Sequence, residues 1–380
     1  SGSIRRTATF SDGEQLGNNS LSPTDSYAIA LKLNGITGEI IWKSYTELSH
    51  GSDTSDRNFI SLRNDNKINL ITNNKNWNDE DGLKILEFDL NGSFEIVGTA
   101  NGFAYRVYSV ESDNNDNLYV AGENWNGQFA GELVKFDSSY NEVWDIEIEG
   151  NNPAFYDVVY DPLNNLIYTS GIGKGANLNP LGEGFTPNYT DDQGHFFAAY
   201  NDQGILQPES VHLFSVNSFD YAQYVALDLM ENRLLISGRV RGYPDLDVTN
   251  DQFYPAQNNP RQNSEDKFIS IYETENGLEL KGQYFFPYDG TLPIYDKNYL
   301  IGNNLIIASD GNSYNQHFSN YNHEEIITFN NIPHYNDGIY SNRYSSIISY
   351  FTNPDNLNIA PVAISQEVTT EEDTAVSITL

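Results

Sequence analysis

The sequence repeats one short pattern along most of its length, and this repetition constrains the fold more than any other feature. Each copy is a polar turn followed by an apolar strand that ends in a small residue. Clear copies lie at 66–72, 116–122, 166–171, 233–238 and 304–309, and a weaker copy at 7–11 opens the chain. Self-similarity of this kind is the sequence signature of a repeat architecture.

A second unit follows each copy and ends on leucine or an aromatic residue. Its six closing residues are Leu33, Phe88, Phe136, Tyr200, Tyr272 and Tyr350. Most are followed by a turn rich in Asn, Asp or Gly and then by a further strand, for example at 39–42 and 141–144. Another candidate strand precedes the first unit at 59–62, 105–110, 156–160, 224–227 and 293–295. Each repeat is therefore predicted to be four short strands, with almost no helical periodicity.

A single four-stranded unit of this size cannot bury both of its faces. Radial stacking of such units does so and leaves only short strand edges. We therefore predict an all-β fold, a β-propeller of six blades over residues 4–355, with seven blades as the alternative. Tandem β-sandwiches are disfavoured because their repeats would be about 100 residues each. Since the first repeat lacks an inner strand, one blade is expected to be closed by chain from the far end or left short.

Several segments resemble the bacterial beta-propeller repeat families. The third element of their unit, a D-x-F-V-x-K-L strand, is matched by residues 133–137 and 30–33. The inner strand, the second strand and the tryptophan strand are matched by 156–161, 167–171 and 137–144. The resemblance covers residues 4–355, weakens in the later repeats because of long insertions, and implies the fold more than a function.

The last 25 residues have a different character. Residues 358–363 read Asn-Ile-Ala-Pro-Val-Ala, and residues 369–380 carry a Thr-Glu-Glu-Asp-Thr turn before an alternating strand. This pattern resembles the opening of bacterial cadherin-like or Ig-like tandem repeats. We therefore divide the chain into a propeller, 1–355, and a linker with the first strand of a truncated repeat, 356–380.

That resemblance implies a setting in large secreted surface proteins, calcium-dependent adhesins among them. The chain is then one monomeric module of a longer bacterial cell-surface protein, located outside the cell. The opening Ser1-Gly2-Ser3, with no initiator methionine, fits an excised piece of such a chain.

Charge and composition exclude several classes of partner. The chain has 20 Lys and Arg against 53 Asp and Glu, a net charge of −33, and an isoelectric point near 4.2. Nucleic acid and anionic bilayers would be repelled. No run approaches the roughly 20 apolar residues of a membrane helix, so direct membrane insertion is not expected. Since the chain has no cysteine, disulfides, thiolate metal sites and cysteine nucleophiles are excluded.

One acidic segment is a candidate cation site. Asp245, Asp247 and Asp251 present carboxylates at alternate positions and again one turn later, in an insertion between strands. Such oxygen ligands can wrap around Ca²⁺. The segment lacks the glycine and the distal glutamate of an EF-hand loop, and the competing interpretation is a solvated acidic loop. We predict calcium here.

Aromatic residues in the insertions are the candidate ligand contacts. They are Trp77, Trp125, Tyr243, Tyr254, Tyr314 and Tyr321, mostly with Asn nearby. Aromatic faces stack on sugars or apolar side chains, and amides satisfy hydroxyl or backbone groups. The competing interpretation is that the two tryptophans pack between blades.

The sequence predicts a non-catalytic adhesion module that binds a glycan or a protein on a target surface. The sialidase box, the G-x-S-x-G elbow and the H-E-x-x-H motif are all missing. Carboxylates are too numerous for a glycosidase pair to be chosen. The alternatives are a secreted propeller hydrolase or lyase acting on carbohydrate or phosphoester, and a purely structural spacer.

Overall fold

A computed structural model gives the architecture of the protein. It describes residues 2–5, 8–9, 15–16, 26–34, 39–48, 58–65, 67–73, 83–100, 106–125, 128–188, 194–214, 221–230, 232–241, 244–249, 266–287, 297–301, 304–311 and 345–352. Within these residues there is no helix of the length and apolar character that crossing a membrane requires.

Four sheets have four antiparallel strands each, and within each sheet the strands are adjacent in chain order. The first sheet holds β6 (Asn58–Leu62), β7 (Ile68–Asn73), β8 (Leu83–Phe88) and β9 (Phe94–Ala100); the second holds β10 (Arg106–Ser112), β11 (Leu118–Trp125), β12 (Phe129–Phe136) and β13 (Glu142–Glu149). The third holds β14 (Asn151–Asp161), β15 (Leu166–Lys174), β16 (His195–Asn201) and β17 (Leu206–Leu213); the fourth holds β18 (Tyr221–Met230), β19 (Arg233–Arg241), β20 (Asp266–Glu273) and β21 (Glu279–Pro287).

Two further sheets have three described strands each. The N-terminal sheet has the order β1 (Gly2–Arg5), β4 (Ser26–Leu33), β5 (Ile40–Leu48). The C-terminal sheet has the order β22 (Lys297–Ile301), β23 (Asn304–Gly311), β24 (Ser345–Thr352). A separate hairpin pairs β2 (Ala8–Thr9) with β3 (Gln15–Leu16).

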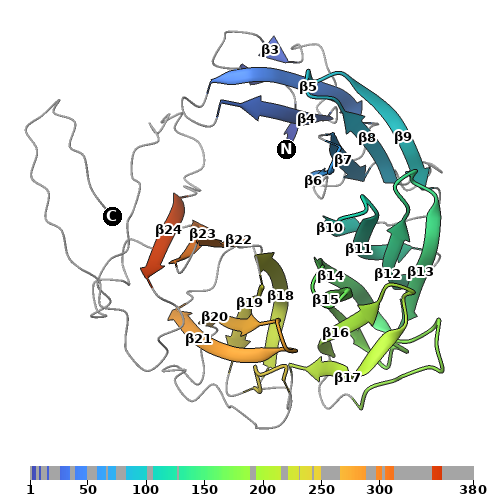
Figure 1. Ribbon diagram of the computed structural model, residues 1–380, viewed down its shortest axis with the longest axis vertical. Helices are drawn as coiled ribbons and strands as arrows, with labels where there is room; N and C mark the ends of the chain where they lie inside the picture. The colour runs from blue at the N-terminus through green and yellow to red at the C-terminus, as the bar shows by residue number, and fades with distance from the viewer. Residues whose placement is uncertain are drawn as a thin grey trace, which may run out of the picture.

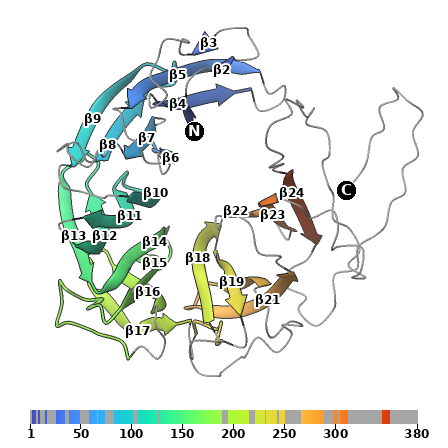
Figure 2. The ribbon, with the colours of Figure 1, turned by 180° about the vertical axis from the view of Figure 1, so that it is seen from behind.

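The six sheets are arranged around a common axis, with β6, β10, β14, β18 and β22 innermost (Figure 1). The reverse view in Figure 2 shows the same circular order, and β5, β9, β13, β17 and β21 lie towards the perimeter. This is the arrangement of a β-propeller, and the prediction of an all-β propeller is confirmed. The number of blades in the complete ring stays a prediction.

Equivalent strands of neighbouring sheets run in the same direction, because residues at equivalent positions of two sheets are in contact. The N–H of Asn64 donates to Asp116 Oδ1 (2.7 Å), and both residues lie in the turn that follows an innermost strand. Tyr108 and Tyr156, on successive innermost strands, make an edge-to-face contact with ring centroids 5.4 Å apart. The turns after the first and third strands therefore share one edge of the ring, the turn edge. The connections between second and third strands share the other, the insertion edge.

Two strand predictions were wrong. The weak copy at 7–11 does not supply the second strand of the first repeat, because the backbone of β1 pairs with β4 in the register Gly2↔Ile29 to Arg5↔Ser26. The innermost strand of the last sheet is Lys297–Ile301, which pairs with β23, and residues 293–295 lie outside the described residues. In both cases pairing with a neighbouring strand, and not local apolar character, selects the segment.

The apolar core lies between the sheets. One cluster joins Tyr119, Leu133 and Ile146 of the second four-stranded sheet to Phe155 and Phe196 of the third, all of them buried. Similar clusters join the third sheet to the fourth and the first to the second. Each sheet therefore depends on its neighbours to remove its faces from water.

A repeated contact ties the perimeter of one sheet to the next. The indole N–H of Trp42 on β5 donates to the carbonyl of Leu90 (3.0 Å), and that of Trp144 on β13 donates to the carbonyl of Asp202 (3.0 Å). Leu90 and Asp202 occupy the same place in the turn after a third strand. At the seam between β6–β9 and β10–β13, the donor to the equivalent carbonyl, that of Ser138, is Arg63, which lies in the turn after β6 (3.2 Å).

Each of these turns also contains a residue with positive φ. It is glycine where a tryptophan packs on the turn and tyrosine where an arginine does. Gly92 (φ +85°) and Gly204 (φ +73°) lie under Trp42 and Trp144, so close that a Cβ would come within 2.7 Å and 3.0 Å of the rings. The equivalent residue at the arginine seam is Tyr140 (φ 63°), and the Arg63 guanidinium lies 5.4 Å from its ring centroid. Tyr140 also donates to Glu87 (2.7 Å), which pairs with Lys67.

Alanine at Gly204 is expected to cost more stability than alanine at Gly277. Both glycines have positive φ, which costs an L-residue about 1–2 kcal/mol, but a Cβ at Gly277 meets nothing within 4 Å. Gly204→Ala also pushes against Trp144, adding about 1–3 kcal/mol. Urea denaturation of both variants measures the difference, and equal losses would contradict the steric role of the tryptophan.

One carboxylate on the outer strand β13 is poorly solvated. Asp145 is half-buried opposite Val134 on β12, and its Oδ1 is buried with no hydrogen-bond partner among the described residues. Burial, and then the charges of Glu142 and Glu147, raise the pKa of Asp145 to about 6. Its protonated form is therefore favoured by the folded state.

Asp145→Asn is expected to stabilise the protein at high pH and not at low pH. Since the folded pKa lies above the ordinary value, the contribution of Asp145 is complete below about pH 4 and is lost as the pH rises through 6. Above pH 6 the variant should gain about 1–2 kcal/mol, allowing for partial exposure. Melting curves at pH 4 and pH 8 test this, and a gain of the same size at both would refute it.

Candidate ligand-binding site

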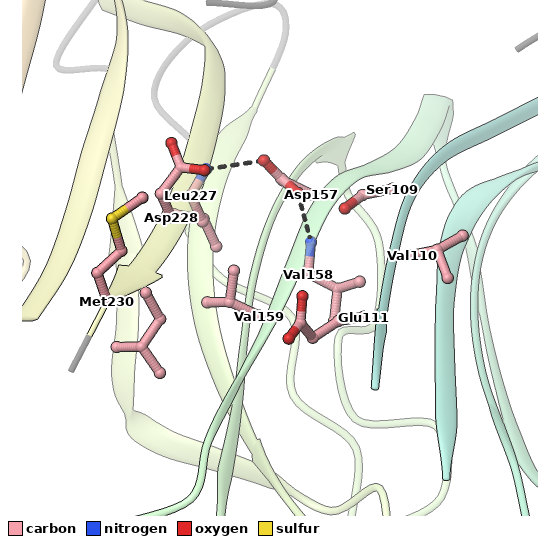
Figure 3. Close-up of a pocket in the computed structure, with 10 residues that line it drawn as sticks. Ser109, Val110, Glu111, Asp157, Val158, Val159, Leu227, Asp228 and Met230 are labelled. Carbon is pink, nitrogen blue, oxygen red and sulfur yellow. Dashed lines mark hydrogen bonds between the residues drawn. The ribbon is translucent and has the colours of Figure 1, made fainter. Parts of the chain in front are cut away.

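A cavity of about 120 Å³ is lined by three successive innermost strands, and we call it the axial cavity because these strands lie nearest the axis of the ring. It is lined by Ser109, Val110 and Glu111 of β10, by Asp157, Val158 and Val159 of β14, and by Leu227, Asp228, Leu229 and Met230 of β18. Figure 3 shows these side chains around one space, with the acidic groups contributed by all three strands.

Each of the three strands has an irregularity in its register just before the cavity. The shifts lie between Val107 and Ser109, between Phe155 and Asp157, and between Gln223 and Ala226. A β-bulge bends a strand and redirects a side chain. Ser109 and Asp157 are the first paired residues after their bulges, opposite Ala121 and Ser170, so they occupy equivalent positions in two sheets.

Asp157 joins two neighbouring sheets at the wall of the cavity. Its carboxylate accepts the N–H of Val158 (3.0 Å) and, across the seam, the N–H of Leu227 (2.8 Å). The hydroxyl of Ser170 donates to the carbonyl of Val225 on the same neighbouring strand. Both groups bind the bulged backbone of β18, whose free edge would otherwise leave buried polar groups unpaired.

The polar lining is acidic. Glu111, Asp157, Asp228 and the Ser109 hydroxyl supply oxygen, and none of the ten lining residues is basic. In the described part of the chain no three His, Asp or Glu side chains are grouped closely enough to hold a metal ion. Since carboxylates only accept hydrogen bonds, a ligand in this cavity has to bring donors.

Five of the six predicted aromatic contacts lie outside the described residues: Trp77, Tyr243, Tyr254, Tyr314 and Tyr321. Trp125 is the last residue of β11, where its backbone pairs with Phe129. The end of β11 places the backbone of Trp125 at the insertion edge. The contact of the six residues with a ligand stays a prediction.

The predicted acidic loop is packed and not solvated where it is described. Leu246 is fully buried, and Asp247 is 3% exposed. Asp245 accepts the N–H of Asp247 (3.1 Å), and Asp247 accepts both the N–H (3.0 Å) and the hydroxyl (2.6 Å) of Thr249. The interpretation as a solvated loop was therefore wrong for 244–249, because Leu246 anchors the segment in the core.

The preceding sheet has the same arrangement with neutral residues. Leu178 is buried between Asn177 and Asn179, and Asn177 accepts the N–H of Asn179 (3.0 Å). In both sheets the closing tyrosine of the third strand donates to the leucine carbonyl, Tyr200 to Leu178 and Tyr272 to Leu246, each at 2.8 Å. Asp245 and Asp247 therefore have a structural role that asparagine also performs. Asp251 is not among the described residues, and calcium binding stays a prediction.

Sequence reasoning missed the cavity residues Glu111, Asp157 and Asp228. Their strands were predicted, but their carboxylates were not distinguished from the many others in this acidic chain. The available signal was position, because each acidic residue stands directly beside an apolar residue of a predicted innermost strand: Val110, Val158 or Leu227.

Comparison with known proteins adds little. No protein-family model matches the chain, and no curated protein matches it in sequence. A structure of an ulvan lyase of the polysaccharide lyase family PL25 is similar at 9% identity, covering 76% of this chain and 78% of that chain, with a TM-score of 0.43. The neuraminidase-like N11 protein of A/flat-faced bat/Peru/033/2010 gives 10% identity, 68% and 67% coverage and a TM-score of 0.37.

The β-propeller domain of the Trilobed protease from Pyrococcus furiosus gives 10% identity, 75% and 88% coverage and a TM-score of 0.33. Likeness at this level carries no argument about activity. The class is defined by the arrangement of the chain's own sheets, which is that of an all-β protein of the propeller type with a polar cavity against its innermost strands.

Asp157→Ala is expected to lower the free energy of unfolding by about 1–3 kcal/mol, because it leaves the buried N–H groups of Val158 and Leu227 without their acceptor. Ser109→Ala, at the equivalent position of the preceding sheet, is the matched control and should cost less than half as much. Urea midpoints measure both. Equal losses would show that the contact between sheets has no special weight.

Proposed function

We propose that this protein is a carbohydrate-binding β-propeller that takes a neutral or amino sugar in its axial cavity. The observation that carries the proposal is the lining of that cavity: three carboxylates and a hydroxyl from three separate strands, with no basic residue among them. Sugar hydroxyls and ammonium groups are the donors that such a lining accepts.

The apolar part of the lining supports the same ligand. Val110, Leu229 and Met230 stand beside the acidic groups, and binding sites combine apolar walls with a few polar groups that fix orientation. The cavity is smaller than the roughly 300 Å³ of common small-molecule sites. It therefore suits one sugar unit or a terminal group, with the remainder of a glycan outside it.

Charge selects against acidic glycans. Uronic acids, sulfated sugars and sialic acids would bring a negative charge to a cavity with three carboxylates on a chain of net charge −33. Like charges in a confined space repel strongly. Under this proposal the wider role is that of a binding module on a bacterial cell surface. Its insertion-edge aromatics Trp77 and Trp125 then extend the contact, and calcium is an accessory ion.

The binding test is a glycan array of neutral, amino and acidic sugars, run with and without EDTA and followed by calorimetry on the best neutral or amino ligand. Glu111→Gln and Asp228→Asn should each weaken binding about 10-fold or more, the usual weight of a hydrogen bond to a charged group. Glu209→Gln, on the perimeter strand β17, makes the same charge change on an exposed residue and should have no effect.

Unchanged affinity in both cavity variants, or a preference for acidic glycans, would refute the proposal.

A second candidate is hydrolysis or lysis of carbohydrate by the same site. It is favoured by the presence of two carboxylates, Glu111 and Asp228, in the lining of one cavity, since paired carboxylates perform glycosidic chemistry. Release of shortened sugar by the unaltered protein, abolished in Glu111→Gln with binding retained, would establish the enzyme.

A further inference from the structure

The bulges of β10 and β14 contain the same type of residue at the same place. The extra residue, which has no direct partner on the second strand, is Tyr108 in β10 and Tyr156 in β14. Each directly precedes a residue that lines the axial cavity, Ser109 or Asp157. A bulge redirects the side chain of its extra residue. Two tyrosines therefore stand at equivalent places beside the axial cavity.

Both tyrosines are partly exposed, although the strand on either side of each one is buried. The preceding residues, Val107 and Phe155, are 2% and 0% exposed, and the following residues, Ser109 and Asp157, are also buried. Since the contribution of an apolar group to folding grows with the area it removes from water, a partly exposed ring contributes less than full burial would. The exposed part of each ring is available to a ligand.

The two rings hold each other in a fixed arrangement. Tyr108 and Tyr156 make their edge-to-face contact across the seam between the second and third four-stranded sheets, with an angle of 85° between the ring planes. On its other side Tyr156 contacts the ring of His195 on β16, with centroids 6.1 Å apart, and His195 is buried. A ligand that meets rings already held in place loses less entropy on binding than one that must order them.

The third strand that lines the cavity has no tyrosine at this place. In the bulge of β18 the two residues opposite Gly238 are Tyr224 and Val225, so Val225 holds the place of Tyr108 and Tyr156. Val225 is 2% exposed, and its carbonyl accepts the hydroxyl of Ser170. The pair of partly exposed rings therefore belongs to the seam between β10 and β14 and is not repeated between β14 and β18.

The tyrosines lie on the side of the cavity that is nearer to the insertion edge. β10 begins beside the end of β11, where Arg106 pairs with Glu123, and β14 likewise begins beside the end of β15. The first residues of both innermost strands are therefore the nearest to the insertion edge, and the tyrosines come before the cavity residues. Consecutive residues of a strand are only about 3.3 Å apart. A sugar joined to one in the cavity would therefore reach the two rings.

We propose that Tyr108 and Tyr156 form a second sugar subsite, which stacks on the unit joined to the one in the axial cavity. The inference rests on the proposed function and adds a preference for oligosaccharides and a direction. The end of the glycan lies in the cavity, and the remainder extends towards the insertion edge. A tyrosine ring offers an apolar face to the C–H groups of a sugar and a hydroxyl to its polar groups. The competing interpretation is that the pair only packs the seam.

Calorimetric titration tests the subsite, with glucosamine, glucose and the β-1,4-linked disaccharide of each as probes. The measured quantity is the ratio of disaccharide to monosaccharide affinity, expected to be about 3 to 10 in the unaltered protein. Tyr108→Ala and Tyr156→Ala should each reduce this ratio about 3-fold or more. Tyr108→Phe and Tyr156→Phe should keep it, because the ring remains. Tyr45→Ala, on the perimeter strand β5 and 42% exposed, is the control and should change nothing.

Two outcomes would overturn the subsite while leaving the proposed function intact. One is a disaccharide that binds no more tightly than its monosaccharide. The other is an unchanged affinity ratio in both alanine variants; if their melting temperatures also fell, the pair would only pack the seam. Failure of every probe to bind would instead refute the axial cavity as a sugar site, and the subsite with it. The two failures are therefore distinguishable.

Discussion

The whole structure depends on the burial of sheet faces by neighbouring sheets. No sheet of four short strands can remove both of its faces from water alone, and the apolar clusters accordingly lie between sheets and join residues from two of them. Burial of this kind is strong but has no direction. The orientation of one sheet on the next is therefore set by a few polar contacts. The tryptophan and arginine bonds hold the perimeter, and Asp157 holds the axis.

The axial cavity follows from the same arrangement. The innermost strands present free backbone edges, and bulges in β10, β14 and β18 distort those edges at one level of the ring. Asp157 satisfies one bulged backbone across a seam, and Glu111 and Asp228 complete the acidic lining of the cavity. Carboxylates therefore suit two purposes here. They accept hydrogen bonds from a free strand edge, and they would accept hydrogen bonds from a ligand.

Much of the fold could be predicted, because strand alternation and turn residues are local. The third strands end at or within two residues of the predicted closing residues Phe88, Phe136 and Tyr200. The predictions for the first strand and for the last innermost strand were wrong because pairing with a neighbouring strand, and not local apolar character, determines which residues form them. The cavity was missed because three carboxylates that meet in space are separated by about 50–70 residues in sequence, a convergence that only the packing of sheets produces. Asp245 and Asp247 were correctly singled out as unusual, but Leu246 between them was the residue that determines their place in the core.

The turns after the third strands differ at one position, which is glycine in two sheets (Gly92 and Gly204) and tyrosine in another (Tyr140). This difference matters in a protein built from similar repeats. Similar units can join in the wrong order, because the burial of apolar faces has no direction. Here Gly92 and Gly204 leave a recess for an indole ring, while Tyr140 fills that recess and instead receives a guanidinium. A tryptophan-bearing sheet offered to the tyrosine turn meets a collision, and an arginine-bearing sheet offered to a glycine turn finds no ring. The two kinds of seam therefore distinguish a tryptophan-bearing neighbour from an arginine-bearing one, independently of how much surface each seam buries.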